Sequence, residues 1–302
     1  MSYQQTIQRP AEIEGVGLHT AVRSHLRFVP APPDTGVVFR RVDLDNFEIE
    51  ARVINVARVS YATSLMKHGV LLSTTEHVLA ALYSCGIDNV YVEVDALELP
   101  ILDGSSKPFI DLLAETGTRK QRRPRKYLRV IKPLEFIDGR RRMGIYPCDT
   151  FRVNCFVDYN HPAVGPQEIE MNVTRETFSR ELAPARTFGF MRDFAGLRAM
   201  GLIRGGSVEN AIVLDDKSIL NGPLRFPDEF GRHKTLDLIG DLALVGRPLQ
   251  ALVVAHKAGH ALHTQLVTKL LADRSLWTET TEDHPAAGET RTSPSLPASA
   301  LS

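Results

Sequence analysis

The sequence contains only three cysteines, and Cys85, Cys148 and Cys155 are widely spaced and form no CxxC pair. Such sparse thiols argue against both a disulfide framework and a thiolate zinc site. The chain also lacks an uncharged apolar run long enough to cross a bilayer, and its first residues lack the apolar core of a signal peptide. We therefore expect a cytoplasmic protein with reduced, mostly buried cysteines and no stable insertion into a membrane.

No excess of charge of either sign is present, because lysine plus arginine and aspartate plus glutamate number 36 each. Nothing therefore draws the whole molecule toward nucleic acid or an anionic membrane, and any basic function has to be local. The P-loop, GxGxxG, GxSxG and HExxH patterns do not occur either. Their absence argues against NTPase, nucleotide-redox, α/β-hydrolase and thermolysin-like chemistry.

The chain does contain ordinary material for a folded protein, with 43% apolar and 24% charged residues over 302 positions. This length predicts two domains or one large one. In the first block, Ser73 and Glu76 have the S-x-x-E spacing of a capping box, so a helix is predicted to start there and to end near Gly86. The following NVYVEVDA alternates like a half-buried strand, and Asp103 begins a turn and cap before a second helix.

The segment RKQRRPRK, residues 119–126, lacks an apolar face and favours a solvated linker. Beyond it we predict strands around an Asp138-Gly139 hairpin, a strand over residues 251–256, and helices near 175–182, 192–200, 232–245 and 261–271. We therefore expect an α+β fold with two layered sheet-and-helix domains, at residues 1–122 and 123–278. The polar residues 279–302 are predicted to be a disordered tail.

The strongest local signal for chemistry is RHKTLDLIGD, residues 232–241. On a helix, His233, Asp237 and Asp241 lie one above the other, because positions four apart share a face. An imidazole and a carboxylate one turn apart can both ligate zinc. By spacing alone, however, the favoured interpretation is an exposed His–Asp pair that stabilises the helix by roughly a few tenths of a kcal/mol.

A zinc site needs a third ligand, and His77 is the best candidate because the carboxylate of Glu76 lies beside it. In HExxH enzymes, a glutamate next to a ligand histidine acts as a general base. Here Glu76 precedes the histidine, and it fits equally well as the capping-box partner of Ser73. His77 fits equally well as a buried core histidine.

Three histidines, His256, His260 and His263, cluster at a predicted strand-to-helix turn. A histidine at such a position can titrate near neutral pH and act as a general acid, or the cluster can be a plain polar turn. Two glycine-bearing segments, around Thr187 and Gly206, are compatible with close approach of the backbone to a ligand. Alone, these segments are weak signals.

Taken together, STTEHVLAAL, GIDNVYVEVDALELPILDGSS, ARTFGFMRD, GGSVENAIVLDD, DEFGRHKTLDLIGDLAL and HKAGHALH resemble the UDP-3-O-acyl-N-acetylglucosamine deacetylases, the zinc amidases of lipid A biosynthesis. The resemblance runs from about Gln4 to Trp277, in order and with matching intervals. It implies two domains of α/β layers with the active site between them. The implied reaction is hydrolysis of the N-acetyl group of UDP-3-O-(3-hydroxyacyl)-N-acetylglucosamine, which releases acetate.

The resemblance also implies a metal site. His77, His233 and Asp237 match the family's zinc ligands and leave a fourth position for water, as a catalytic site requires. Glu76 matches the base that takes a proton from that water. Fe(II) would suit the same ligands in the cell. We expect the enzyme to be a monomer.

Four more positions match the family's catalytic groups. His260 matches the imidazolium that steadies the tetrahedral intermediate and protonates the departing amine. Asp241 matches the carboxylate that orients His260 and favours its charged form. Thr187 matches the hydroxyl that assists zinc at the oxyanion, and Lys234 matches a cation that contacts the substrate.

The substrate's acyl chain needs an apolar slot, and the resemblance places one segment of this chain along it, although an ordinary amphipathic helix facing the core is the alternative. The residues implied to line the acyl tunnel are Phe188, Met191, Phe194, Leu197, Gly206 and Val213. Arg141 and His161 match positions near the UDP moiety, but arginines after a hairpin turn also commonly form a solvated edge.

Two other interpretations stay open at this point. One is a zinc amidohydrolase of the same fold that acts on another N-acetyl sugar nucleotide. The other is a structural-metal or nucleic-acid-binding module that uses the basic residues 119–129 and binds in a salt-sensitive way.

Overall fold

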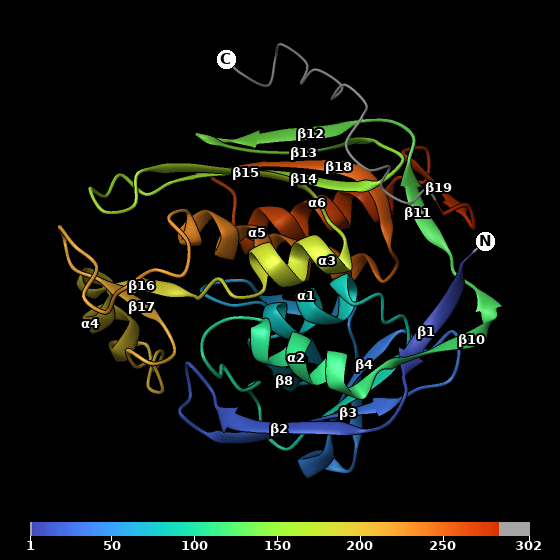
Figure 1. Cartoon of the computed structure of the whole chain (residues 1–302), viewed down its shortest axis with the longest axis horizontal. Coiled ribbons are helices and arrows are strands. Elements are labelled where there is room, and N and C mark those ends of the chain that lie inside the picture. Colours follow the sequence, from blue (N-terminus) through green and yellow to red (C-terminus); the bar gives the residue numbers. More distant parts are fainter. Residues whose placement is uncertain (1, 284–302) are drawn as a thin grey trace.

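The computed structural model describes residues 2–283. In this part of the chain two sheets form the outer layers, and helices fill the space between them (Figure 1). The predicted α+β class is confirmed. No helix of the described residues is both long and apolar enough to span a bilayer. Of the cysteines, Cys85 and Cys155 are buried and all three are unpaired.

The first layer is a five-stranded sheet with the order β2-β3-β9-β4-β5. In β9 the alternation predicted from NVYVEVDA is confirmed, because Val90, Val92 and Val94 are fully buried. The strands of this sheet are β2 (Ala11–Val16), β3 (Arg23–Pro30), β4 (Val37–Arg41), β5 (Phe47–Glu50) and β9 (Val90–Val94). Helix α1 (Glu76–Ser84) comes before β9 in the chain, and helix α2 (Lys107–Thr116) comes after it. A small sheet of β6 (Val56–Arg58), β7 (Ser64–Lys67) and β8 (Val70–Leu72) lies before α1, with short 3-10 turns at Val42–Leu44 and Val53–Asn55.

The second layer is a seven-stranded sheet built around β18. The predicted hairpin at Asp138-Gly139 is confirmed, because β12 and β13 pair antiparallel with Asp138 opposite Arg141. A strand that we did not predict, β15, pairs with β14. The elements of this layer are β11 (Tyr127–Val130), β12 (Leu134–Asp138), β13 (Arg141–Pro147), β14 (Phe151–Asp158), β15 (Pro166–Asn172), β18 (Leu249–His256), β19 (Trp277–Thr280), α5 (Glu229–Leu242) with a 3-10 turn at Ala243–Val245, and α6 (His260–Ala272).

In the sequence, a smaller lobe is inserted between β15 and α5 of the second layer, and it lies at the left of Figure 1. It contains α4 (Met191–Ala199) and the parallel pair β16 (Phe188–Phe190) and β17 (Ile212–Leu214). The helix predicted near 175–182 begins as α3 (Arg175–Thr177) and continues with π-type turns over Phe178–Leu182.

The basic segment is not a solvated linker. Residues Thr118–Pro124 form strand β10, which pairs antiparallel with β1 (Tyr3–Ile7). A strand needs backbone partners rather than an apolar face, and lysine and arginine are common on exposed strands because they discourage pairing with another chain. Our domain boundary at residue 122 falls inside β10 and stays a prediction.

The predicted tail also needs a correction at its start. Residues 279 and 280 belong to β19, which pairs antiparallel with β11. Backbone pairing and the buried Trp277 hold this segment in place, although its composition is polar. The rest of the predicted tail, from residue 284 on, lies outside the described residues.

Candidate metal centre and active site

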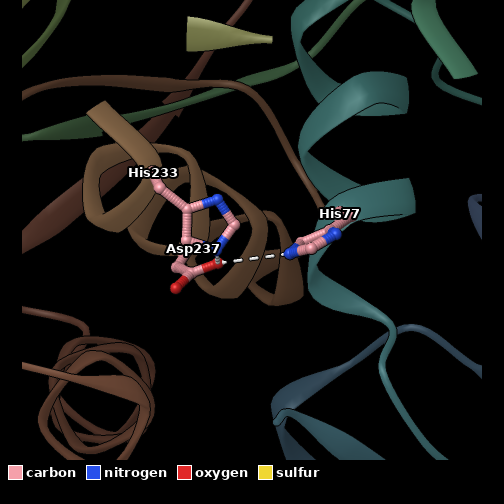
Figure 2. Close-up of side chains that lie close together, drawn as sticks. All are labelled: His77, His233 and Asp237. Carbon is pink, nitrogen blue, oxygen red and sulfur yellow. Dashed lines mark ion pairs between the residues drawn. The ribbon is translucent and has the colours of Figure 1, made fainter. Parts of the chain in front are cut away.

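Three side chains from two distant segments converge between the sheets. His77 comes from α1, whereas His233 and Asp237 come from successive turns of α5. Asp237 Oδ1 lies 3.6 Å from His77 Nε2 and 3.4 Å from His233 Nε2. Figure 2 shows His77 reaching across from α1 to the carboxylate. One ligand atom from each residue lies within 4.8 Å of the others, and none of the three is more than 4% exposed.

Helix periodicity and close packing explain this arrangement. His233 and Asp237 share a face because they are four residues apart. The N-terminal end of α1 then approaches α5 at Gly240, where a Cβ would lie only 2.2 Å from the backbone oxygen of Glu76. Because Gly240 has no side chain, the two helices that carry the ligands can pack in direct contact.

The chemistry of these residues fits a divalent cation. Asp237 Oδ1 is buried and has no hydrogen-bond partner within residues 2–283, which is unfavourable for a carboxylate oxygen unless a cation compensates it. Burial lowers the pKa of His233 to about 3, so its imidazole is neutral. The Nδ1–H of His233 donates to the Ala185 carbonyl at 3.1 Å, which leaves the Nε2 lone pair facing Asp237. Two imidazole nitrogens and a carboxylate are a common zinc set.

Glu76 is buried beside this centre, and the predicted capping box is wrong. Its Oε2 accepts the backbone N–H of Thr63 at 3.1 Å, while Ser73 pairs its hydroxyl with Ser64 instead. Helix α1 begins at Glu76 itself, and Thr75 provides no side-chain cap. Burial raises the pKa of the Glu76 carboxyl. A cavity next to it is lined by the metal-centre residues, Glu76, Thr187, Lys234 and His260, and also by Leu18, His19, Tyr61, Thr74 and Ile101.

His260 lies across this cavity and is held by a carboxylate. Its Nδ1–H donates to Asp241 Oδ2 at 2.7 Å, and its Nε2 lies 3.9 Å from Asp237 Oδ2. Burial alone would lower the pKa of His260, but the charge of Asp241 and its hydrogen bond outweigh burial and raise the pKa to about 9. Thr63, which we did not predict, donates its hydroxyl to Asp241 Oδ1 at 2.5 Å. A threonine in a loop carries no sequence signal for such a role.

Lys234 and Thr187 also reach the cavity. Lys234 Nζ lies 2.7 Å from Asp237 Oδ2, and although burial by itself lowers its pKa, the Asp237 charge raises it overall. The backbone of Thr187 is fixed by bonds to Gly104 and Ile212. The preceding Arg186 donates its backbone N–H and its Nε to the buried Glu229 at the start of α5, at 3.0 and 2.9 Å.

The residues implied to line an acyl tunnel lie in the smaller lobe, but only Phe188 reaches the metal centre, with its ring 6.2 Å from that of His233. Near it, Gly189 is next to Phe194, and Val213 is opposite Gly189 in the β16–β17 pair. Leu197 and Val213 are buried, whereas Met191 and Gly206 are exposed. The tunnel stays a prediction.

The two residues matched to the UDP moiety are not brought together in a visible site. Arg141 is exposed at the first position of β13. His161 is buried, with Nδ1 accepting the Ala163 N–H at 3.2 Å and Nε2 lying 2.7 Å from the Asp215 carbonyl oxygen. Both of its nitrogens therefore have partners within the protein, and the UDP contacts stay a prediction.

The α+β fold buries two histidines and an aspartate, and one oxygen of that carboxylate has no hydrogen-bond partner among the described residues. A glutamate and a cationic histidine face these three side chains. This is the architecture of a metal-dependent hydrolase. A family model described as LpxC, UDP-3-O-acyl N-acetylglycosamine deacetylase, matches residues 4–272. The chain belongs to this family, which confirms the resemblance in the sequence.

Curated relatives bear the same description along nearly their whole lengths. A UDP-3-O-acyl-N-acetylglucosamine deacetylase of Solibacter usitatus is 52% identical over 292 residues, which cover 96% of this chain and 99% of that protein. Proteins of the same name from Myxococcus xanthus and Syntrophotalea carbinolica are 46% and 43% identical, and the matches cover 91% and 92% of this chain and 88% and 90% of theirs.

Proposed function

We propose that this protein is a zinc-dependent deacetylase of lipid A biosynthesis that acts in the cytoplasm as a monomer. Its proposed substrate is UDP-3-O-(3-hydroxyacyl)-N-acetylglucosamine, and its products are acetate and the free amine. The observation that carries the proposal is the convergence of His77, His233 and Asp237 next to Glu76 and His260. The names of the relatives support the substrate.

His77, His233 and Asp237 would hold the metal. When bound, a divalent cation supplies Lewis-acid polarisation of the acetamide carbonyl and makes water easier to deprotonate near neutral pH. We propose zinc because nitrogen and carboxylate ligands suit it, and Fe(II) suits the same set. Lys234, paired with Asp237, neutralises part of the buried charge and lies where it can contact the substrate.

Glu76 is the proposed general base. It accepts a proton from the water that adds to the acetyl carbon, and burial raises its pKa toward the range in which a carboxylate is an effective base. Thr187 is proposed to donate its hydroxyl to the oxygen that becomes negative in the tetrahedral intermediate.

His260 is the proposed general acid. Because Asp241 keeps it protonated, its Nε2–H can stabilise the intermediate and then transfer a proton to the amine as the C–N bond breaks. The smaller lobe around Phe188, Phe194 and Leu197 is proposed to bind the acyl chain, together with Met191, Gly206 and Val213. Arg141 and His161 are proposed to lie near the UDP moiety.

The decisive experiment compares zinc-loaded wild type with Glu76→Gln. Acetate release is expected to fall by roughly 10²- to 10⁴-fold in the variant, because the amide cannot accept a proton. The zinc content of the two proteins should be equal, since Glu76 is not a proposed ligand. A Glu76→Gln enzyme that turns over like wild type would contradict the mechanism.

Substrate selectivity is tested with two sugar nucleotides that differ only in the 3-O-acyl chain. Faster acetate release from the acylated substrate is expected, because a buried chain stabilises the complex by roughly 0.8 kcal/mol per methylene. Comparable rates would refute the acyl site and favour another N-acetyl sugar nucleotide as the natural substrate.

A further inference from the structure

The Asp241 carboxylate has a second imidazole partner that the proposed mechanism does not use. His263 of α6 donates its Nδ1–H to Asp241 Oδ2 at 2.8 Å. The same oxygen accepts the Nδ1–H of His260 at 2.7 Å, and Thr63 donates its hydroxyl to Oδ1 at 2.5 Å. Asp241 therefore accepts three hydrogen bonds, two of them at one oxygen.

The spacing of the two histidines along α6 explains why both can reach Asp241 Oδ2. His260 and His263 are three residues apart, so both project from the face of α6 that packs against α5. Their rings lie 6.0 Å apart and are inclined by 76°, so each approaches the carboxylate separately. The third histidine of the motif, His256, does not take part, because it stacks on Phe156.

The surroundings of His263 indicate why an imidazole is present. The residue is 1% exposed, and its Nε2 is buried without a hydrogen-bond partner among the described residues. Burying an unpaired nitrogen is unfavourable, and an apolar side chain of similar size would fill the space without that cost. The hydrogen bond to Asp241 is the contribution that an apolar residue could not make.

This bond limits how Asp241 can move. With two donors from α6 at Oδ2 and one from the loop before β7 at Oδ1, the carboxylate cannot turn about its Cβ–Cγ bond without losing at least one partner. The direction of the His260 Nδ1–H bond is then fixed, and Nε2 of His260 faces the cavity beside Asp237.

We propose that His263 is a positioning residue that holds Asp241 and, through it, keeps His260 Nε2 aimed at the reacting amide. The inference rests on the proposed function, because it concerns the orientation of the general acid. Small errors in such an orientation lower the rate of the chemical step more than they weaken substrate binding.

The test uses full-length, zinc-loaded enzyme and three substitutions at His263. His263→Leu removes the donor and is expected to lower kcat by roughly tenfold, with KM changed by less than about twofold. His263→Asn places an amide N–H near the position of Nδ1 and should restore kcat to within about threefold of wild type. His263→Gln carries the same amide at a different reach and should not restore it. Comparable kcat values in the asparagine and glutamine variants would overturn the proposal, even if the leucine variant does not fold.

Two controls separate positioning from general loss of structure. Thr264→Val removes a neighbouring buried hydroxyl of α6 that makes no hydrogen bond to any described residue, and it should leave kcat unchanged. In an Asp241→Asn background, His263→Leu should cause no further loss of kcat, because its effect passes through Asp241. Losses that multiply would show that His263 acts by another route.

A readout that does not depend on turnover keeps this inference separate from the proposed function. Proton NMR of the zinc-loaded protein should show the His260 Nδ1–H exchanging with solvent at least about threefold faster in His263→Leu than in wild type, because its acceptor, Asp241, has lost one of its donors and is held less firmly. Unchanged exchange would contradict the positioning role. A wild-type protein that binds zinc but releases no acetate would contradict the proposed function instead.

Discussion

Gly240 of α5 lies directly against the backbone of Glu76 in α1, where a Cβ would come within 2.2 Å of the Glu76 carbonyl oxygen. Neither the oxygen nor the glycine takes part in chemistry. Their contact nevertheless sets the separation of the helices that carry His77 on one side and His233 and Asp237 on the other.

Gly240→Ala should therefore weaken both stability and metal binding. Alanine favours a helix by about 1 kcal/mol, but the clash with backbone should outweigh this and lower the free energy of unfolding by about 1–3 kcal/mol. Urea denaturation and competitive zinc titration measure the two effects. Gly196→Ala in α4 is the matched control, because apart from its chain neighbours and the helix's own backbone no atom of the described residues lies within 4 Å of its Cβ position, and it should be neutral or slightly stabilising. Wild-type zinc affinity in Gly240→Ala would show that the separation of the helices is not critical.

His233→Ala should lose zinc and activity together, because it removes one of the three proposed ligands. It also removes the imidazole that lies 3.4 Å from Asp237 Oδ1, an oxygen that already has no hydrogen-bond partner among the described residues. Metal content after dialysis and acetate release are the measurements. His256→Ala, which removes a ring stacked on Phe156 outside the cavity, should retain both. Full zinc occupancy in His233→Ala would remove His233 from the proposed ligands.

The pH–rate profile should fall on its alkaline side near pH 9. Burial disfavours the charged form of His260, but Asp241 outweighs it and raises the pKa to about 9, so the proton needed by the leaving amine is present below that pH and lost above it. Asp241→Asn removes the largest of the charges that raise the pKa of His260, while burial still lowers it, so this limb should move to lower pH. Measuring kcat/KM from pH 5 to 10 in both proteins provides the comparison, and an unmoved limb would exclude His260 as its origin.

Glu229→Ala should destabilise the protein by about 3–5 kcal/mol, because it leaves the Arg186 guanidinium without the partner of a buried ion pair. The segment that carries Thr187 would lose its anchor to α5, so acetate release should also fall. Chemical denaturation provides the free energy. Glu176→Ala, in an exposed pair with Arg180, should change stability by less than about 1 kcal/mol. Equal effects of the two substitutions would contradict the buried-pair argument.

Local patterns predicted much of the fold. The alternation in β9, the hairpin after Asp138 and the face of α5 follow from periodicity and turn chemistry, which depend on neighbours in the chain. The errors arose where a longer-range partner decided the outcome. The basic strand β10 exists because β1 pairs with it, and Ser73 does not cap α1 because Ser64 and Thr63 take the two groups of the expected box.

The amino-acid sequence by itself determined that His233, Asp237 and Asp241 share one face of a helix, because backbone hydrogen bonds within α5 set that spacing regardless of the rest of the molecule. Only the tertiary structure decided that His77 meets them and that one Asp237 oxygen has no hydrogen-bond partner in the part of the chain that is described. It also decided that Asp241 accepts hydrogen bonds from Thr63, His260 and His263. Those relationships depend on how closely buried helix surfaces pack across the layers, and a position such as Gly240 reveals its part in them only when both surfaces are seen together.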